Sequence, residues 1–178
     1  MKAVETAIPG VLVLEPTVYE DPRGCFFESF NQAAFDAVVG DGFRFVQDNH
    51  SVSRKGVLRG LHHQVERPQG KLVRVTRGTI FDVACDIRPG SPTFGRWEGF
   101  ELSGENRRQV WIPPGLAHGF LVLSDVADVL YKTTDYYAPA CERCIAWNDP
   151  TLAIAWPLAG PPELSARDAA AGPLGPPA

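Results

Sequence analysis

The sequence predicts an all-β domain, a double-stranded β-helix of the jelly-roll type, and three features favour it. Apolar runs are short, and 17 Gly and 16 Pro residues are spread between them along the 178 residues. These runs predict about ten short strands, which is typical of a double-sheet jelly roll or barrel. No internal repeat or linker divides the chain, so we expect one domain over residues 1–170.

The first half of the chain supplies five of these strands and one helix. Asn31 can cap a short helix that runs to Val39 and ends at Gly40. A turn at residues 21–24 precedes the second strand. The strands are expected at residues 11–14, 25–30, 43–53, 57–64 and 71–76.

The second half continues the same pattern after a tight turn at Arg77-Gly78. Six strands are expected at residues 79–87, 97–103, 108–112, 120–123, 129–135 and 143–147. Ser165 begins a short C-terminal helix. The last residues, 171–178, are rich in Gly, Pro and Ala, and we expect a disordered tail there.

Composition and charge exclude several classes of function. The formal net charge is -4 and no basic block occurs, which argues against a nucleic-acid partner. No apolar run approaches the roughly 20 residues of a membrane span. Residues 8–10 and 15–16 interrupt the N-terminal apolar stretches with Pro and Gly, unlike a signal peptide, so we expect a cytoplasmic protein. The four cysteines are then free thiols, and Cys141 and Cys144 lack the second pair that a four-ligand zinc site needs.

The predicted strand at residues 57–64 carries two adjacent histidines. Because side chains alternate along a strand, Leu58, His62 and Gln64 are expected on one face and His63 on the other. Arg59 falls nominally on the wrong face to join His62. A bulge at Gly60 would redirect it, so we expect a distortion there if Arg59 serves the same site.

A second segment places another histidine near this strand. Pro113-x-Gly115-x-x-His118 looks like the second half of a cupin motif, and His62 stands at the leading histidine of the first half. A metal-binding cupin usually has a histidine two residues later, where this chain has Gln64. Two convincing ligands are too few for a divalent metal site, so we expect neither metal nor other cofactor.

Acid–base chemistry without a metal is the alternative. A histidine such as His62 suits proton abstraction near neutral pH. Such a base works better beside a carboxylate, for which Asp82, Asp86 and Asp168 are candidates. Lys71 could stabilise an oxyanion, and Tyr131 could return a proton from another side.

Four segments, in this order and spacing, resemble the dTDP-4-dehydrorhamnose 3,5-epimerase family. They are residues 59–64 (RGLHHQ), 69–75 (QGKLVRV), 112–120 (IPPGLAHGF) and 131–137 (YKTTDYY). The resemblance extends from Asp21 to Asp168, nearly the whole chain. It implies a cofactor-free cupin-type jelly roll, usually a homodimer. It also implies epimerisation of carbons 3 and 5 of a dTDP-linked 4-keto-6-deoxy sugar in L-rhamnose biosynthesis.

The resemblance also assigns roles to particular residues. His62 falls at the family's proton acceptor, Tyr131 at its proton donor and Asp168 at the carboxylate beside the base. Lys71 and His118 match positions near the sugar. The substrate-binding positions match Arg23, Glu28, Gln47, Asp48, Asn49, Arg59, Glu142 and Arg167, the last of which is usually lysine in the family.

Several alternatives stay open at this point. Ser165 and Asp168 also fit a capping-box pattern, in which the acid would serve the helix N-terminus. The nucleobase could stack on Phe26 or Tyr137. Competing functions are epimerisation of one carbon only, a metal-dependent cupin dioxygenase, and a carbohydrate-binding jelly roll without activity.

Overall fold

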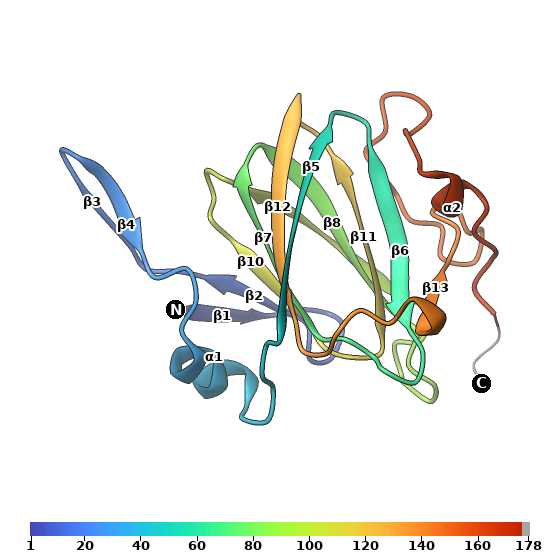
Figure 1. Ribbon diagram of the computed structural model, residues 1–178, viewed down its shortest axis with the longest axis horizontal. Helices are drawn as coiled ribbons and strands as arrows, with labels where there is room; N and C mark the ends of the chain where they lie inside the picture. Colours follow the sequence, from blue (N-terminus) through green and yellow to red (C-terminus); the bar gives the residue numbers. More distant parts are fainter. Residues whose placement is uncertain (176–178) are drawn as a thin grey trace.

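Two stacked β-sheets form the body of the computed structural model, which describes residues 1–175 (Figure 1). One sheet has six strands in the order β1-β2-β10-β7-β12-β5, and the other has five in the order β13-β6-β11-β8-β9. A separate hairpin, β3–β4, completes the strands of the described residues. The predicted all-β jelly roll is confirmed.

The strand bounds follow the predicted runs closely in the middle of the chain. The six-stranded sheet contains β1 (Lys2–Glu5), β2 (Leu12–Glu15), β5 (Gln47–Arg54), β7 (Lys71–Arg77), β10 (Gln109–Ile112) and β12 (Val126–Thr133). The five-stranded sheet contains β6 (Leu58–Gln64), β8 (Thr79–Asp86), β9 (Trp97–Ser103), β11 (Leu116–Val122) and β13 (Glu142–Cys144). The hairpin consists of β3 (Val18–Asp21) and β4 (Gly24–Phe27).

The sequence missed some strands and strand ends. It did not predict β1 or β3, which are short and mostly exposed, so neither has an apolar face to signal it. Strand β11 begins at Leu116, four residues before the predicted start at 120, because it starts directly after the Pro113–Gly115 turn and is buried throughout. His118 therefore lies in a strand.

Short helices occupy the positions predicted for them. Helix α1 (Gln32–Val39) is capped by Asn31, whose Oδ1 accepts a hydrogen bond from the Ala34 N–H at 3.2 Å. Gly40 ends the helix at φ 101°, a conformation that suits glycine. Helix α2 (Ala166–Ala169) follows Ser165, and a 3-10 turn, η1 (Pro139–Cys141), precedes β13. No helix of the described residues is long and apolar enough to cross a membrane.

Apolar packing holds the layers together in three clusters. Val73, Ile80 and Leu102 belong to the cluster between the sheets. A second cluster lies on the outer face of the five-stranded sheet, under the C-terminal segment. Helix α1 covers a third cluster, in which the rings of Phe35 and Trp111 lie 5.1 Å apart, edge to face.

The start of the predicted disordered tail makes contacts with this body. Gly172 pairs with Ile145 as an isolated bridge, and the Leu174 N–H donates a hydrogen bond to Asp149 Oδ2 at 2.8 Å. Leu174 also packs on the outer apolar cluster. Residues 171–175 therefore contact the body, whereas the sequence predicted a disordered tail from residue 171. Residues 176–178 lie outside the described part of the chain.

The β3–β4 hairpin, here called the arm, projects from the body (Figure 1). Tyr19 and Phe26 on the arm are 65% and 71% exposed. Two strands alone are marginally stable in water, so the arm lacks the packing that the rest of the fold has.

Candidate active site

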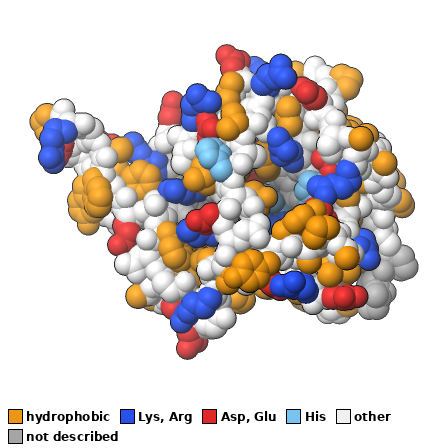
Figure 2. Space-filling view, in the orientation of Figure 1, with side chains coloured by type: hydrophobic (Ala, Val, Ile, Leu, Met, Phe, Trp, Pro, Cys, Tyr) orange, Lys and Arg blue, Asp and Glu red, His pale blue; other side chains and the backbone are white. Residues whose placement is uncertain are grey.

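A cavity of about 320 Å³ opens where the two sheets face each other. Figure 2 shows histidine and basic side chains gathered around the middle of this face of the molecule. The lining residues come from β5, β6, β7, β11, β12 and the segments after them: Gln47, Asn49, Ser51, Arg59, His62, His63, Gln64, Gln69, Lys71, His118, Phe120, Tyr131, Tyr137, Glu142 and Arg167.

A bulge in β6 brings Arg59 and His62 to the same side. The register between β6 and β11 shifts by one residue between the pairs Arg59–Phe120 and His62–His118. Gly60 has φ 126°, and a Cβ there would lie 2.5 Å from the Gly119 Cα, so only glycine fits. The predicted distortion at Gly60 is confirmed.

The same bulge corrects two details of the expected alternation. Leu58 was predicted to share the face of His62, but it packs in the outer apolar cluster with Leu61. His63 was predicted to face away from the cavity, but it lines the cavity edge as well as a second hollow. Burial, helped by the charge of Lys71, lowers the pKa of His63 to about 4, so its ring is neutral.

His62 and Asp168 form a close pair at the cavity wall. The Nε2 atom of His62 lies 2.6 Å from Asp168 Oδ1, and Asp168 is only 3% exposed. Burial alone would raise the pKa of Asp168, but the hydrogen bonds from His62 and its neighbours together outweigh burial and lower the pKa. Ser165 Oγ accepts from the Asp168 backbone N–H at 3.1 Å, so Ser165 is the helix cap and the carboxylate is directed to His62.

A second histidine–aspartate pair lies deeper. His118 Nε2 is 2.7 Å from Asp82 Oδ2, and both residues are buried. Burial lowers the pKa of His118 although the carboxylate opposes this. The other oxygen of Asp82, Oδ1, is buried and has no hydrogen-bond partner among the described residues. The sequence had offered Asp82 as a possible partner for the base or as an ion-paired residue behind the site.

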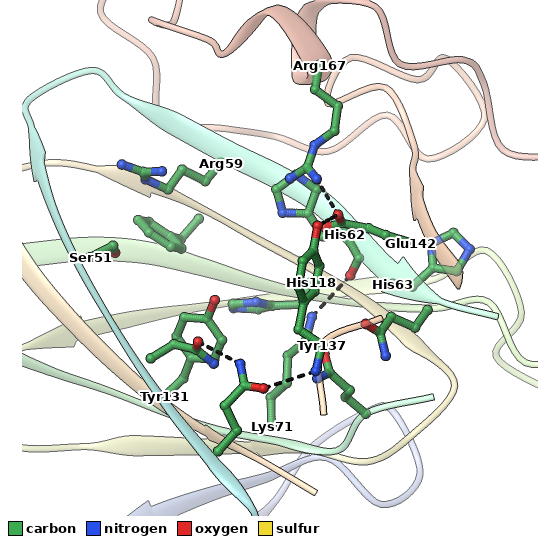
Figure 3. A pocket seen from close by; sticks show the side chains of 15 residues that line it. Ser51, Arg59, His62, His63, Lys71, His118, Tyr131, Tyr137, Glu142 and Arg167 are labelled. Atoms are coloured by element: carbon green, nitrogen blue, oxygen red, sulfur yellow. Dashed lines mark hydrogen bonds and ion pairs between the residues drawn. The ribbon is translucent and has the colours of Figure 1, made fainter. Parts of the chain in front are cut away.

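Lys71 and Tyr131 reach the cavity from the six-stranded sheet, facing His62 on the other sheet (Figure 3). Lys71 Nζ donates a hydrogen bond to the His62 carbonyl at 3.2 Å. Burial lowers the pKa of Lys71 to about 8, and nearby Asp82 partly opposes the shift. Burial raises the pKa of Tyr131, so its phenol keeps the proton at neutral pH.

A hydrogen-bonded group of three residues forms the cavity rim (Figure 3). Tyr137 donates its hydroxyl proton to Glu142 Oε2 at 2.6 Å, and Arg167 forms an ion pair with the same oxygen. Arg167 Nη2 also lies 3.3 Å from His62 Nε2. Arg167 therefore contacts both the rim carboxylate and the histidine.

Strand β5 directs alternate residues into the cavity. Gln47 and Asn49 line it and are joined by a hydrogen bond of 2.9 Å, with Ser51 next in the same row. Asp48 points to the opposite face, where it pairs with Lys132 at 2.9 Å. Because side chains alternate between the two faces of a strand, the sequence could have shown that Asp48 points away from Gln47 and Asn49.

Two further residues with family matches do not reach the cavity of the same chain. Arg23 lies on the arm and pairs with Asp21 at 2.6 Å. Glu28 follows the arm and accepts a hydrogen bond from Asn31 Nδ2 at 3.0 Å. Conversely, several cavity residues were not among the predicted site residues: Ser51, His63, Gln64, Gln69 and Phe120; Tyr137 had been considered only for stacking on the nucleobase.

Gln64 occupies the position at which a metal-binding cupin has a further histidine. Its Nε2 donates to the Arg67 carbonyl at 2.8 Å and its Oε1 accepts from the Ala138 N–H at 2.8 Å. Both ends of the amide thus hold the backbone around the cavity. The side chain serves the fold at this position and does not extend a ligand set around His62.

Fold and site together define the class: a cupin-type jelly roll with acid–base groups on facing sheets. Comparison with known proteins then gives the family. The profile described as dTDP-4-dehydrorhamnose 3,5-epimerase matches residues 5–175, and the chain belongs to this family.

Individual relatives agree along the whole chain. The dTDP-4-dehydrorhamnose 3,5-epimerase of Pseudomonas aeruginosa is 61% identical over 168 residues, covering 94% of this chain and 93% of that protein. The crystal structure of dTDP-6-deoxy-D-glucose-3,5-epimerase from Legionella pneumophila, in complex with dTDP-4-keto-L-rhamnose, superposes with a TM-score of 0.95 at 55% identity, covering 97% of this chain and 92% of that one. A 3'-monoepimerase from Streptomyces bikiniensis, in complex with dTDP-quinovose, gives a TM-score of 0.90 at 39% identity, covering 95% and 86%.

Proposed function

We propose that this protein epimerises carbons 3 and 5 of a dTDP-4-keto-6-deoxy-hexose, dTDP-4-dehydro-6-deoxy-D-glucose, to give dTDP-4-dehydro-L-rhamnose. The observation that carries the proposal is the placement of His62, backed by Asp168, on one sheet and Tyr131 on the sheet that faces it. Inversion of a carbon requires removal of a proton from one face and its return to the other. In a cavity between two sheets, a base on one sheet and an acid on the other can reach the two faces of the carbon.

The reaction begins at the C4 ketone, which acidifies the hydrogens on both neighbouring carbons. With Nε2 of His62 donating to Asp168, the lone pair is on Nδ1, and this nitrogen takes the proton. The carboxylate of Asp168 stabilises the imidazolium that forms. The resulting enolate needs a positive donor at its oxygen, and the buried ammonium of Lys71 is suited to this.

Tyr131 returns a proton to the opposite face of the carbon. Burial keeps its phenol protonated, so the acid is available at neutral pH. His118, whose Nε2 donates to Asp82, would accept a hydrogen bond from a sugar hydroxyl at its Nδ1 on the cavity floor. The same base and acid can act on each of the two carbons in turn, once the sugar turns or shifts in the cavity.

The nucleoside diphosphate would occupy the open side of the cavity. Arg59 and Arg167 can form bidentate hydrogen bonds with phosphate oxygens. Arg59 is oriented by a hydrogen bond from its Nε to Ser53 Oγ at 3.0 Å. Further groups along the same wall are polar or aromatic, the latter offering a ring for stacking: Gln47, Asn49, Glu142 and Tyr137.

The arm supports a homodimer as part of this proposal. Its Phe26 is 71% exposed, and the side chain of Arg23, which pairs with the neighbouring Asp21, is 90% exposed. A second copy would cover these residues and could receive Arg23, Glu28 and Asp48 near its own nucleotide. Mixing Arg23→Ala with His62→Ala protein tests this, because a swapped arm restores activity to mixed dimers and an unswapped arm does not.

A cytoplasmic location fits the four free cysteines, Cys25, Cys85, Cys141 and Cys144. Fractionation of cells with an antibody against the protein tests it, and recovery from an oxidising compartment would contradict it.

Incubation with the 4-keto-6-deoxy sugar nucleotide in deuterium oxide tests the function. Deuterium at both C3 and C5 of the product is the expected result. Deuterium at one carbon would make the protein a mono-epimerase, like its relative from Streptomyces bikiniensis. Binding without any exchange would make it a carbohydrate-binding jelly roll and refute the enzyme.

A further inference from the structure

His62 and Asp168 meet a third potential ligand, Cys144, at the cavity wall. Cys144 lies in β13 directly opposite His62 in β6. Its Sγ is 3.5 Å from Asp168 Oδ1, and Asp168 Oδ1 is 2.6 Å from His62 Nε2. The ligand atoms of the three residues lie within 4.8 Å of one another.

We propose that Cys144, His62 and Asp168 form a binding site for a thiophilic divalent cation such as Zn²⁺, and that the bound ion inhibits the enzyme. A nitrogen, an oxygen and a sulfur ligand are the set that Zn²⁺ prefers, and three protein ligands plus a water complete a tetrahedron. In this role the ion is an inhibitor, and the epimerisation itself does not use it.

The sulfur–oxygen and nitrogen–oxygen distances need only a small adjustment, and the nitrogen and sulfur lie within 4.8 Å of each other. Zn–N and Zn–O bonds of about 2.0–2.2 Å and a Zn–S bond of about 2.3 Å place tetrahedral ligand atoms roughly 3.3–3.7 Å apart. The sulfur–oxygen distance already falls in this range. The nitrogen–oxygen distance must widen by under about 1 Å, which a rotation of the Asp168 carboxylate can supply.

The charged side chains of Arg167 and Glu142 lie near the site and affect how the ion would enter. Arg167 Nη2 lies 3.3 Å from His62 Nε2 and would repel a cation there. Half of the Arg167 side chain is exposed, and Glu142 already holds the other nitrogen of its guanidinium, so it can turn towards the rim. Hollows beside His62 and Asp168 on one side and beside Cys144 on the other give access from solvent.

The thiol is otherwise unreactive. Burial and the neighbouring Asp168 raise the pKa of Cys144 to about 12. A coordinating metal displaces the thiol proton, so one proton is released for each ion bound.

The inhibition follows from the histidine tautomer and rests on the proposed function. A metal on Nε2 of His62 leaves the ring proton on Nδ1, the nitrogen that must accept the proton of the sugar. It also takes Asp168 away from its hydrogen bond with the ring. The base is thus blocked although the cavity stays open to the substrate.

Titration of the purified protein with Cd²⁺ tests the site without any turnover. One equivalent per chain should produce the ultraviolet thiolate-to-cadmium charge-transfer band. The band should be lost in Cys144→Ala and kept in Cys141→Ala, the matched control from the same C-x-x-C. A band that survives in Cys144→Ala, or that disappears in Cys141→Ala, would overturn the proposed ligand set.

The inhibition has its own measurement. Zn²⁺ should slow deuterium exchange into the substrate, EDTA should restore it, and Cys144→Ala should require at least about tenfold more Zn²⁺ for the same loss, as expected when one of three ligands is removed. Equal sensitivity of the wild type and Cys144→Ala would overturn the inhibitory role. An absence of exchange in metal-free wild type would refute the proposed function instead, and the Cd²⁺ titration would still judge the site.

Discussion

Replacement of Asp168 by asparagine should reduce turnover by about three orders of magnitude. The carboxylate lies 2.6 Å from His62 Nε2 and is 3% exposed, so solvent screens it little. With charge centres roughly 4 Å apart and an effective dielectric constant near 20, it stabilises the imidazolium by about 4 kcal/mol. Each ~1.4 kcal/mol is a factor of ten in rate, which gives a loss of about 10³-fold.

A change in the tautomer of His62 should add to the loss of turnover. In the Asp168→Asn variant, an amide that turns its NH₂ group towards the ring would donate to Nε2 and leave the proton on Nδ1, where the lone pair is needed. The near-identical size of asparagine should keep helix α2 and its Ser165 cap in place. Loss of activity should therefore occur in a folded protein.

The assay is the rate of deuterium incorporation into the substrate, with urea unfolding as the check on folding. Asp82→Asn is the matched control, since it alters the other histidine–aspartate pair. A folded Asp168→Asn protein within about tenfold of wild-type exchange would refute the assignment of His62 and Asp168 as the base and its partner.

Three further predictions follow from individual contacts. Tyr131→Phe should lose about 10²–10⁴-fold in turnover with little change in unfolding midpoint, because only the acid is removed; normal turnover measured by product formation would eliminate Tyr131 as the donor. Lys71 has a pKa of about 8, below its ordinary 10.5. The folded state therefore carries a penalty for the buried charge that is full below pH 8 and disappears as the pH rises towards 10.5. Lys71→Met should abolish turnover yet raise the free energy of unfolding by up to about 3 kcal/mol at about pH 7, and this gain should vanish near pH 10.5. Urea unfolding at a series of pH values measures the difference in stability. A variant less stable than the wild type at neutral pH would contradict the prediction. Gly60→Ala should destabilise the protein by several kcal/mol, since its Cβ would lie 2.5 Å from the Gly119 Cα; an unchanged melting temperature would disprove the close approach.

Local patterns predicted much of the fold and the polar face of the site. Asn31 and Gly40 bound helix α1 as their chemistry requires. The alternation of β5 would place Gln47 and Asn49 together and turn Asp48 away, which the structure does. The sequence treated these three as one set because the family match joined them, and alternation was the better guide to their direction.

Contacts between distant segments could not be predicted in this way. The Asp82–His118 pair joins positions 36 residues apart, and the His62–Asp168 pair joins positions 106 residues apart. Nothing local distinguishes Asp168 from an ordinary helix-capping acid. The family resemblance named Asp168 for this role, but the contact with His62 forms only because α2 lies beside β6 in the folded chain.

By itself, the sequence determined the all-β class, the strand that carries His62 and His63, and the need for a break at Gly60, because turns, caps and alternation act over a few residues. Only the tertiary structure decided that Asp168 and not Asp82 or Asp86 contacts His62, as the family resemblance had implied, that Lys71 is buried, and that Cys144 lies beside both His62 and Asp168. Such choices depend on which strands become neighbours. Burial of the whole apolar core determines which strands pair, and the pattern of a single short segment does not specify its neighbour.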